Sequence, residues 1–339
     1  MAILERNGAL RGTAGTVVFR NFRGMTVVQG LPRKNKKQTL ASKASAGEFG
    51  LASSAAACIR SALKPVFRHL HDGGMVNRFN SAVYRSILGS RTAPRGARDL
   101  HDGDPGCLEG FEFNADSPLS QALKIKPSVT LTEGGRIRVR MEVWDSVTGL
   151  KVPEKIKEMT DRYRLRFLVT AFNFRQEYYE YVSVKDLSVI KWKALESQDF
   201  EMEGVIPEGC MVMVTASLEC LTINETDRST ELANTPSFSP AAILAVFQSA
   251  EALPLGQPRE AIQEACRHHP NLAGYTGNWW LKKVAEQREK LETASQAHRQ
   301  KASASGPPGN NARGKRAKTA DETEENAEAS FVIGRRFSF

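Results

Sequence analysis

Cysteine is scarce in this sequence of 339 residues. The five cysteines are scattered, and no two of them form a C-x-x-C motif: Cys58, Cys107, Cys210, Cys220 and Cys266. An odd and scattered set predicts neither a disulfide framework nor a structural zinc site. We interpret these residues as thiols of a reducing compartment and expect no bound metal.

Long apolar runs are also missing. Glu5 and Arg6 interrupt the segment in which a secretory signal needs an unbroken apolar stretch. No later stretch approaches the roughly 20 apolar residues of a membrane helix. We expect a cytoplasmic protein without membrane insertion, or part of a particle assembled there, unless it leaves the cell by a route without an N-terminal signal.

The common catalytic signatures are absent from the sequence. It has no G-x-G-x-x-G after a strand, no G-x-x-x-x-G-K-[ST], no H-E-x-x-H and no G-x-S-x-G. The missing phosphate cradles argue against nucleotide use, so we expect no cofactor and no enzymatic activity. An active site formed across loops of the fold stays an alternative.

Two short stretches could offer metal ligands. They contribute His69, His71 and Asp72, and His101, Asp102 and Asp104. Imidazole with carboxylate suits zinc or iron. The simpler interpretation, a polar helix end and a polar turn, is favoured.

Acidic residues are rare at the N-terminus, which concentrates the charge of the chain there. Residues 1–43 hold nine Lys or Arg residues and one acid, Glu5, and therefore carry +8 of the formal net charge of +9. A basic arm on a nearly neutral body implies that this segment meets something acidic.

The same segment has the pattern of a β-ribbon followed by helices. Two β-branched runs, 17–19 and 26–28, flank a Gly-containing loop, which predicts a hairpin. Apolar residues at steps of three and four predict a helix over 38–63, with a stripe of small residues that allows a close helix partner. A second helix is expected over 76–87, forming an antiparallel hairpin with the first within one chain or between copies. Residues 89–107 have the composition of a loop.

Alternation with a period of two begins after residue 107. It predicts about eight short strands, at 111–114, 136–143, 162–171, 180–184, 187–192, 200–205, 212–220 and 242–247. One face of each strand is apolar, so we expect two antiparallel sheets stacked as an all-β sandwich.

Six arginines occupy alternating positions on two of these strands: Arg136, Arg138, Arg140, Arg162, Arg164 and Arg166. If the two strands were neighbours, like charges would crowd on one face and destabilise the sheet unless an anion covered them. The favoured alternative is that acids interleave with them, with Glu142, Glu177, Glu180, Glu201 and Glu203 as candidates.

The C-terminal region returns to helical spacing and then becomes polar. Helices are predicted over 258–268 and 278–301, the second as a single helix lying on the body. Residues 302–329 are of low complexity, basic and then acidic, and too polar to fold alone. The last nine residues, FVIGRRFSF, are again partly apolar.

Three stretches resemble a known set of proteins: GTVVFRNFRGMTVVQGLPRK, ASAGEFGLASSAAACIRSALKP and LEGFEFNADSPLSQAL. This set is an uncharacterised family from Bacteroidota, a domain of unknown function. The resemblance covers about residues 12–247 and implies an N-terminal ribbon and helices followed by a β-sandwich. It implies no activity, and the Trp279-Trp280 helix and the tail look like additions to the pattern.

Together these patterns predict an α+β chain in five parts. We expect a basic ribbon arm (1–37), a helical segment with a loop (38–107), a β-sandwich (108–250), a helical extension (251–301) and a disordered tail with an apolar terminal peptide (302–339).

We expect a structural or adaptor protein that assembles with itself or with a larger particle through its arm. The residues expected to dock on a partner are Val17, Phe19, Val27, Phe331, Val332 and Ile333. The alternative is a nucleic-acid-associated protein whose arm grips phosphate. The residues for that role are Arg20, Arg23, Arg33, Lys34, Lys36, Lys37 and Lys43. A capsid-like interior arm would combine both functions.

Overall fold

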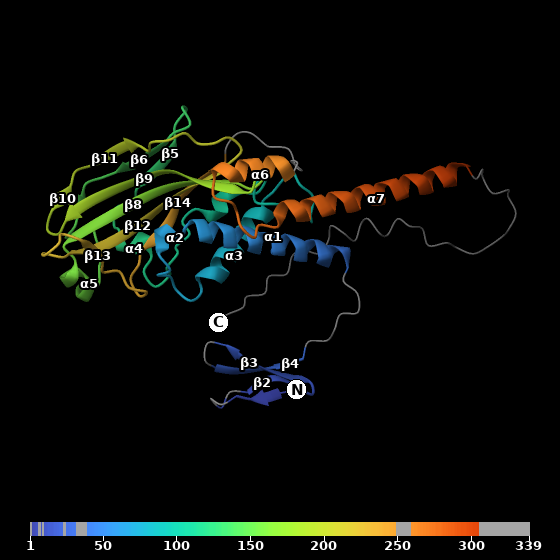
Figure 1. Cartoon of the computed structure of the whole chain (residues 1–339), viewed down its shortest axis with the longest axis horizontal. Coiled ribbons are helices and arrows are strands. Elements are labelled where there is room, and N and C mark those ends of the chain that lie inside the picture. Colours follow the sequence, from blue (N-terminus) through green and yellow to red (C-terminus); the bar gives the residue numbers. More distant parts are fainter. Residues whose placement is uncertain are drawn as a thin grey trace. The chain divides into compact units, whose positions relative to one another are not determined.

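Helices and antiparallel strands both contribute substantially to the fold, as the α+β prediction requires (Figure 1). A computed structural model describes residues 2–5, 8, 10–22, 25–31, 39–248 and 259–304 of the chain. The chain divides into two compact units, residues 1–287 and 288–339. The fold described below belongs to the first unit, and the second contributes the distal half of one helix.

The N-terminal residues form a four-stranded antiparallel sheet. Its strands β1 (Ala2–Leu4), β2 (Leu10–Ala14), β3 (Val17–Phe22) and β4 (Met25–Gly30) follow one another in sequence order. β3 and β4 pair at six consecutive positions, which is the hairpin expected from the sequence. β1 and β2 were not expected as strands, because Gly12 and Ala14 give β2 little of the β-branched character that marks strands.

Three helices follow: α1 (Leu40–Ala62), α2 (Lys64–Phe67) and α3 (Met75–Leu88). The Thr39 side chain caps α1 by accepting a hydrogen bond from the Ser42 amide at 3.1 Å. α1 and α3 pack against each other within one chain, which decides between the two arrangements that the sequence left open. Val76, expected in the apolar stripe of the second helix, is exposed, and Met75 is buried in its place.

The largest sheet contains β8 (Arg162–Asn173), β9 (Tyr178–Ile190), β12 (Met211–Ile223) and β13 (Thr230–Leu232), in the order β13-β12-β8-β9. β14 (Ala241–Gln248) pairs with β12 as the fifth strand. Two of the expected strands, 180–184 and 187–192, are one continuous strand, β9. A register shift at Val169/Thr170 keeps β9 paired with β8 along its length.

Smaller strands form two further sheets. One has the order β11-β6-β5, from β5 (Ser128–Leu131), β6 (Ile137–Met141) and β11 (Gln198–Glu201). The other pairs β7 (Trp144–Asp145) with β10 (Ala194–Leu195). The expected strand 111–114 forms an isolated bridge, Glu112 with Ala242, alongside β14. Short helical turns complete this region: η1 (Pro105–Leu108), α4 (Leu119–Ala122) and α5 (Glu154–Met159).

The five-stranded sheet separates two apolar cores. On one face, Leu168, Phe172 and Met213 pack with residues of α1, α2 and α3. On the other face, side chains such as Phe167 and Val214 pack with β6. Both faces of the sheet are therefore covered over much of its area, by helices on one side and by the three-stranded sheet on the other.

Two helices close the described chain, α6 (Arg259–His268) and α7 (Gly277–Ala304). The start of α7 is fixed by polar contacts: the Asn278 side chain donates to the carbonyl of Phe174 at 2.8 Å, and the Trp280 indole donates to the carbonyl of Gly96 at 3.1 Å. Within the described residues, no helix is long and apolar enough to cross a membrane. The tail was predicted over 302–339, but residues 302–304 continue α7, and the residues from 305 onward lie outside the described residues.

Candidate functional site

The N-terminal sheet sorts its side chains onto two different faces. Residues directly opposite each other in neighbouring strands share a face, and successive residues of a strand alternate between faces. Phe19 pairs with Val28 and with Gly12, and Val17 pairs with Ala14 and with Gly30. One face, the uncharged face, therefore consists of Ala2, Leu4, Leu10, Gly12, Ala14, Val17, Phe19, Asn21, Thr26, Val28 and Gly30.

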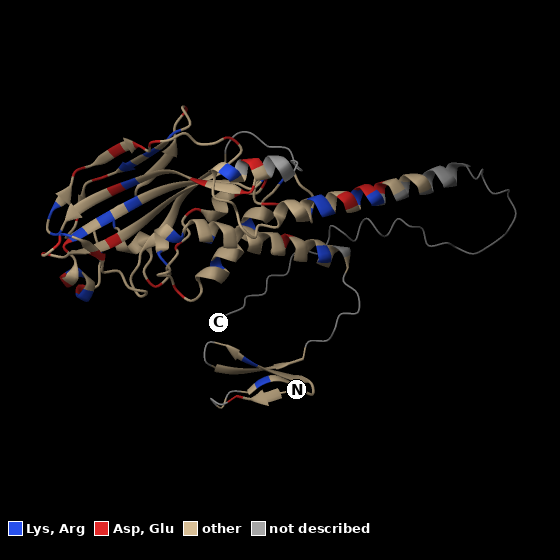
Figure 2. Ribbon diagram, viewed as in Figure 1, with Lys and Arg blue, Asp and Glu red and all other residues tan. Residues whose placement is uncertain are grey.

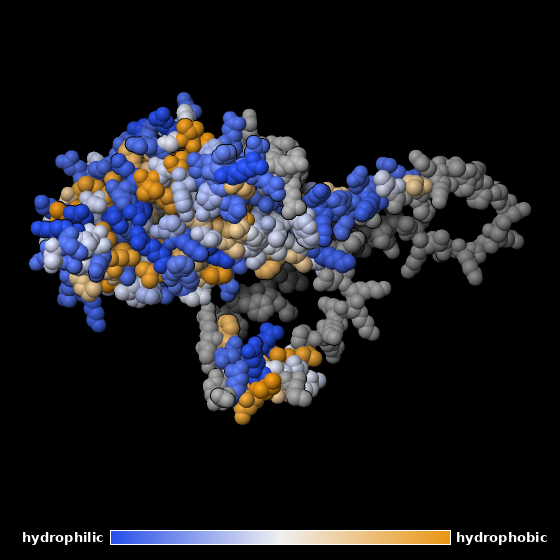
Figure 3. Space-filling model, viewed as in Figure 1, coloured by the Kyte–Doolittle hydropathy of each residue, from blue (hydrophilic) through white to orange (hydrophobic). Residues whose placement is uncertain are grey.

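The opposite side, the arginine face, holds both arginines that the structure describes in this sheet. It consists of Ile3, Arg11, Thr13, Val18, Arg20, Phe22, Met25, Val27 and Gln29. None of the described residues of the four strands is buried. Figure 3 shows apolar residues at the surface of this sheet.

The residues expected to dock on a partner are thus divided between the faces. Val17 and Phe19 lie together on the uncharged face, whereas Val27 lies on the arginine face, opposite Arg20. Of the residues expected to bind phosphate, Arg20 is exposed on β3 and Lys43 is exposed in the first turn of α1, on a different element. The other residues expected to bind phosphate lie outside the described residues: Arg23, Arg33, Lys34, Lys36 and Lys37. Three of the residues expected to dock on a partner also lie outside them: Phe331, Val332 and Ile333.

The six alternating arginines belong to two different sheets, so they do not form one crowded face. Those of β6 and its flank pair with acids of β11: Arg138 and Arg140 with Asp199, at 2.7 and 3.1 Å, and Arg136 with Glu201 at 3.7 Å. Acids therefore interleave with these three arginines, as the favoured alternative predicts. Of the acids named from the sequence, however, only Glu201 pairs with one of these arginines within the described residues.

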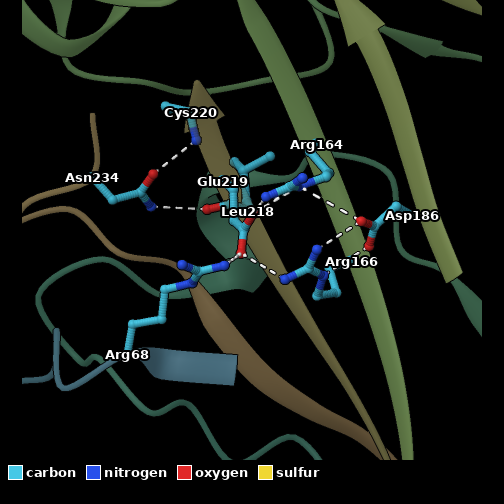
Figure 4. A network of polar contacts seen from close by, with 8 residues as sticks. All are labelled: Arg68, Arg164, Arg166, Asp186, Leu218, Glu219, Cys220 and Asn234. Carbon is cyan, nitrogen blue, oxygen red and sulfur yellow. Dashed lines mark hydrogen bonds and ion pairs between the residues drawn. The ribbon is translucent and has the colours of Figure 1, made fainter. Parts of the chain in front are cut away.

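Two of the arginines of β8, Arg164 and Arg166, join a network around one buried carboxylate (Figure 4). Glu219 of β12, with its side chain 3% exposed, accepts a hydrogen bond from Arg164 Nε at 2.7 Å and another from its Nη2. Arg68, beyond the end of α2, reaches the same carboxylate at 3.0 Å, and Arg166 reaches it at 3.5 Å. One carboxylate thus ties the end of a helix to two strands of the sheet.

Asp186 of β9 completes the network. It accepts two hydrogen bonds from Arg166, at 2.8 and 2.7 Å. Burial alone would raise the pKa of Asp186, but the bonded Arg166 and the charges of Arg164 and Arg68 hold that pKa below its usual value. Three cations and two anions pair here, although Oε1 of Glu219 takes part through ion pairs with Arg68 and Arg166 and accepts no hydrogen bond. Figure 2 shows basic and acidic residues interspersed on these strands.

A second polar cluster is more deeply buried. Arg175, in the turn between β8 and β9 and 2% exposed, bonds to Asp99, which is fully buried, and to Asp102 at 3.1 Å. Burial raises the pKa of Asp99 against the opposing charge of Arg175, and burial together with Arg175 lowers the pKa of His101. Three buried atoms around this cluster have no hydrogen-bond partner: His101 Nδ1, Arg175 Nε and the Tyr275 hydroxyl. The cluster fixes the β8–β9 turn to the loop before η1.

The two stretches considered as metal ligands serve the fold instead. Asp72 accepts hydrogen bonds from the backbone amides of Gly74 and Ala115 and pairs with Arg78. Asp104 caps η1 through the amide of Gly106. Across the part of the chain that the structure describes, no group of three or more His, Cys, Asp or Glu side chains could hold a metal ion.

The five thiols are all free. Burial raises the pKa of Cys58 and of Cys210 to about 11 and that of Cys220 to about 12. The thiolate is the nucleophilic form of cysteine, so these three side chains are poor nucleophiles near neutral pH.

A hollow of about 560 Å³ lies between α3 and the segment from Cys107 to Glu112. Two of its charged side chains are engaged by the fold: Arg78 donates to the carbonyl of Glu112 at 3.0 Å, and the carboxylate of Glu112 accepts from the amides of Leu119 and Ser120. These contacts of Arg78 and Glu112 hold the segment after η1 against α3 and the start of α4.

Comparison with known proteins yields no match to a protein-family model, to a curated protein or to a solved structure. The resemblance to the family from Bacteroidota therefore stays an expectation, and the functional argument depends on the residues described above.

Proposed function

We propose that this protein is a non-enzymatic structural or adaptor protein. In this proposal the N-terminal sheet is an arm through which the chain assembles with copies of itself or with a larger particle, and the remainder is a body built around a β-sandwich. The observation that carries the proposal is the exposure of the sheet: its strands are rich in apolar residues, yet none of the described residues is buried.

The energetics of small sheets support this role. Burial of one Val, Leu or Phe side chain contributes about 1.5–3 kcal/mol, so a partner that covers an apolar face of this sheet would stabilise it. The uncharged face offers Leu4, Leu10, Val17, Phe19 and Val28 for such a contact. Exposed apolar patches of this kind mark interaction sites in soluble proteins.

The alternative proposal is that the arm binds nucleic acid. It is favoured by the exposure of Arg11 and Arg20 on the arginine face and by the basic residues that follow β4 in the sequence. A sheet could use both faces, one against protein and one against phosphate, as a capsid-like interior arm would.

The test compares the full-length chain with a chain lacking residues 1–38. Removal up to residue 38 preserves Thr39, which caps α1. We expect light scattering after size-exclusion chromatography to give an assembly that persists at high salt and after nuclease treatment, and a monomer for the shortened chain.

Two single substitutions on adjacent residues of β3 separate the roles of the faces. Phe19→Glu on the uncharged face should weaken contacts that a partner makes with that face, whereas Arg20→Glu on the arginine face should leave assembly intact. A full-length monomer that carries nuclease-sensitive material, released by salt and by Arg20→Glu, would establish the nucleic-acid alternative in place of assembly.

A further inference from the structure

The strand β4 is an edge of the N-terminal sheet and has none of the usual protections of an edge. The strand order β1-β2-β3-β4 leaves one side of β4 without a neighbour among the described strands. An edge strand presents unpaired N–H and C=O groups, and proteins guard such edges with charges, prolines, bulges or very short strands. β4 reads MTVVQG: it has six residues, no charge and no proline, and it pairs with β3 without a register shift.

The opposite edge of the same sheet is shorter. β1 has three residues, against six in β4, and charged residues flank both strands in the sequence: Glu5 follows β1, and Arg23 and Arg33 lie on either side of β4. The arginines of the sheet lie on the inner strands, Arg11 on β2 and Arg20 on β3. The longest unprotected edge is therefore β4.

We propose that β4 pairs antiparallel with β4 of a second copy of this chain, joining two four-stranded sheets into one of eight strands. This inference rests on the proposed function, in which the N-terminal sheet is the assembly element. A two-fold axis normal to the sheet makes the contact self-complementary and closes it at a dimer.

The chemistry of β4 suits pairing with itself. Registers that place a residue of β4 opposite itself keep the uncharged faces of both copies on the same side, and the two that pair most of the strand place Val27 opposite Val27 or Val28 opposite Val28. The first register also pairs Thr26 with Val28 and Met25 with Gln29, and the second pairs Val27 with Gln29 and Thr26 with Gly30. No like charges oppose each other in either register, and β-branched residues meet at the centre, which favours cross-strand packing.

Cysteine cross-linking of the full-length chain tests the pairing and its register. Opposite Cα atoms of antiparallel strands are about 4.5–5.5 Å apart, within the span of a disulfide. We expect either Val27→Cys or Val28→Cys to give a disulfide-linked dimer under mild oxidation. The control Ala14→Cys, on the same face of inner strand β2, and the unmodified chain with its five native thiols should not.

Added charge tests the edge without relying on oxidation. Thr26→Lys with Val28→Lys places two lysines on β4, and Leu10→Lys with Ala14→Lys places two on the same face of β2. Light scattering should show that the first pair converts the dimer to a monomer, whereas the second pair leaves it a dimer. Loss of the dimer in the β2 variant alone would show that the face docks rather than the edge, and would overturn the proposal.

Other outcomes separate this inference from the proposed function. If both β4 cysteine variants fail to link while deletion of residues 1–38 still releases a monomer, the edge pairing is wrong and the assembly role of the sheet stands. A cross-link from residue 28 to a different protein likewise overturns pairing with a second copy. If the full-length and shortened chains are both monomers, the proposed function fails as well.

Discussion

Two sheets of this protein use similar residues and differ in what covers them. The first eleven residues of β12, from Met211 to Leu221, are all buried, whereas none of the six residues of β3 is buried. Residue types that favour strands occur in both: β12 contains Val and Thr, and β3 contains Val and Phe. Intrinsic β-propensity therefore does not distinguish the two strands. β12 lies between helices on one face and a second sheet on the other. The N-terminal sheet also has apolar residues on both faces, but none of its described residues is buried.

The largest effect that separates the two sheets should come from truncating one phenylalanine in each. Phe167 is fully buried in the five-stranded sheet, and Phe167→Ala should lower the free energy of unfolding by about 3–5 kcal/mol because it leaves a cavity. Phe19→Ala should leave the urea-unfolding midpoint of the body unchanged and weaken assembly. Equal loss of body stability in both variants would mean that the N-terminal sheet belongs to the same cooperative unit.

The next largest effect concerns Arg175, the buried cation in the turn between β8 and β9. Asp99→Ala removes the fully buried partner of Arg175, whose side chain is 2% exposed, and should cost about 3 kcal/mol because the buried guanidinium keeps only the partly exposed Asp102 as an anionic partner. The double variant with Arg175→Met should recover part of this loss. Urea titration of both variants measures the difference, and no recovery in the double variant would contradict the explanation.

A smaller effect is expected at the centre of the network in Figure 4. Glu219→Gln should cost about 2 kcal/mol, because a buried carboxylate loses charge-assisted hydrogen bonds from arginine. The matched variant is Asp199→Asn, which removes an exposed partner of Arg138 and should cost much less, because solvent screens an exposed ion pair. Equal losses, measured by thermal unfolding, would contradict the distinction between the two sites.

The smallest effect is the acid dependence contributed by Asp186. Its pKa is lower in the folded chain than in the unfolded chain, so it stabilises the fold above the unfolded pKa of about 3.9. That contribution disappears as the pH falls through the lower, folded pKa. Asp186→Asn should therefore flatten the loss of stability with falling pH below about 4, relative to the unmodified chain. An unchanged slope would show that other carboxylates dominate.

Periodicity in the sequence predicted most elements of the fold. Alternation identified β8, β12 and β14, and spacing of three and four identified α1 and α3 to within a few residues. It did not reveal that β6 and β8 lie in different sheets, because strand order depends on contacts distant in sequence. β2 was missed because a strand with Gly12 and Ala14 has no local signal.

The polar networks were less predictable than the elements. Glu219 interrupts a run of otherwise apolar and small residues in β12, and this could have indicated a buried charge in need of a cation. The pairing of Asp99 with Arg175 has no such signal, because it joins two loops 76 positions apart in sequence. The residues after β4 and the last residues of the chain lie outside the described residues, so their roles in docking or in phosphate binding stay predictions.

The bridge between residue 112 and β14 has a consequence for the order of events during synthesis. The amide of Gly110 donates to the carbonyl of Ile243, and the amide of Phe113 donates to the carbonyl of Ala241, so this part of the body cannot close until β14 has been made. Every pairing within the N-terminal sheet joins residues among the first thirty. Local contacts form faster than distant ones, and hydrogen-exchange labelling during refolding would time the two regions. We expect the N-terminal sheet to fold first on the ribosome, so that neighbouring nascent chains could recognise each other before either body is complete.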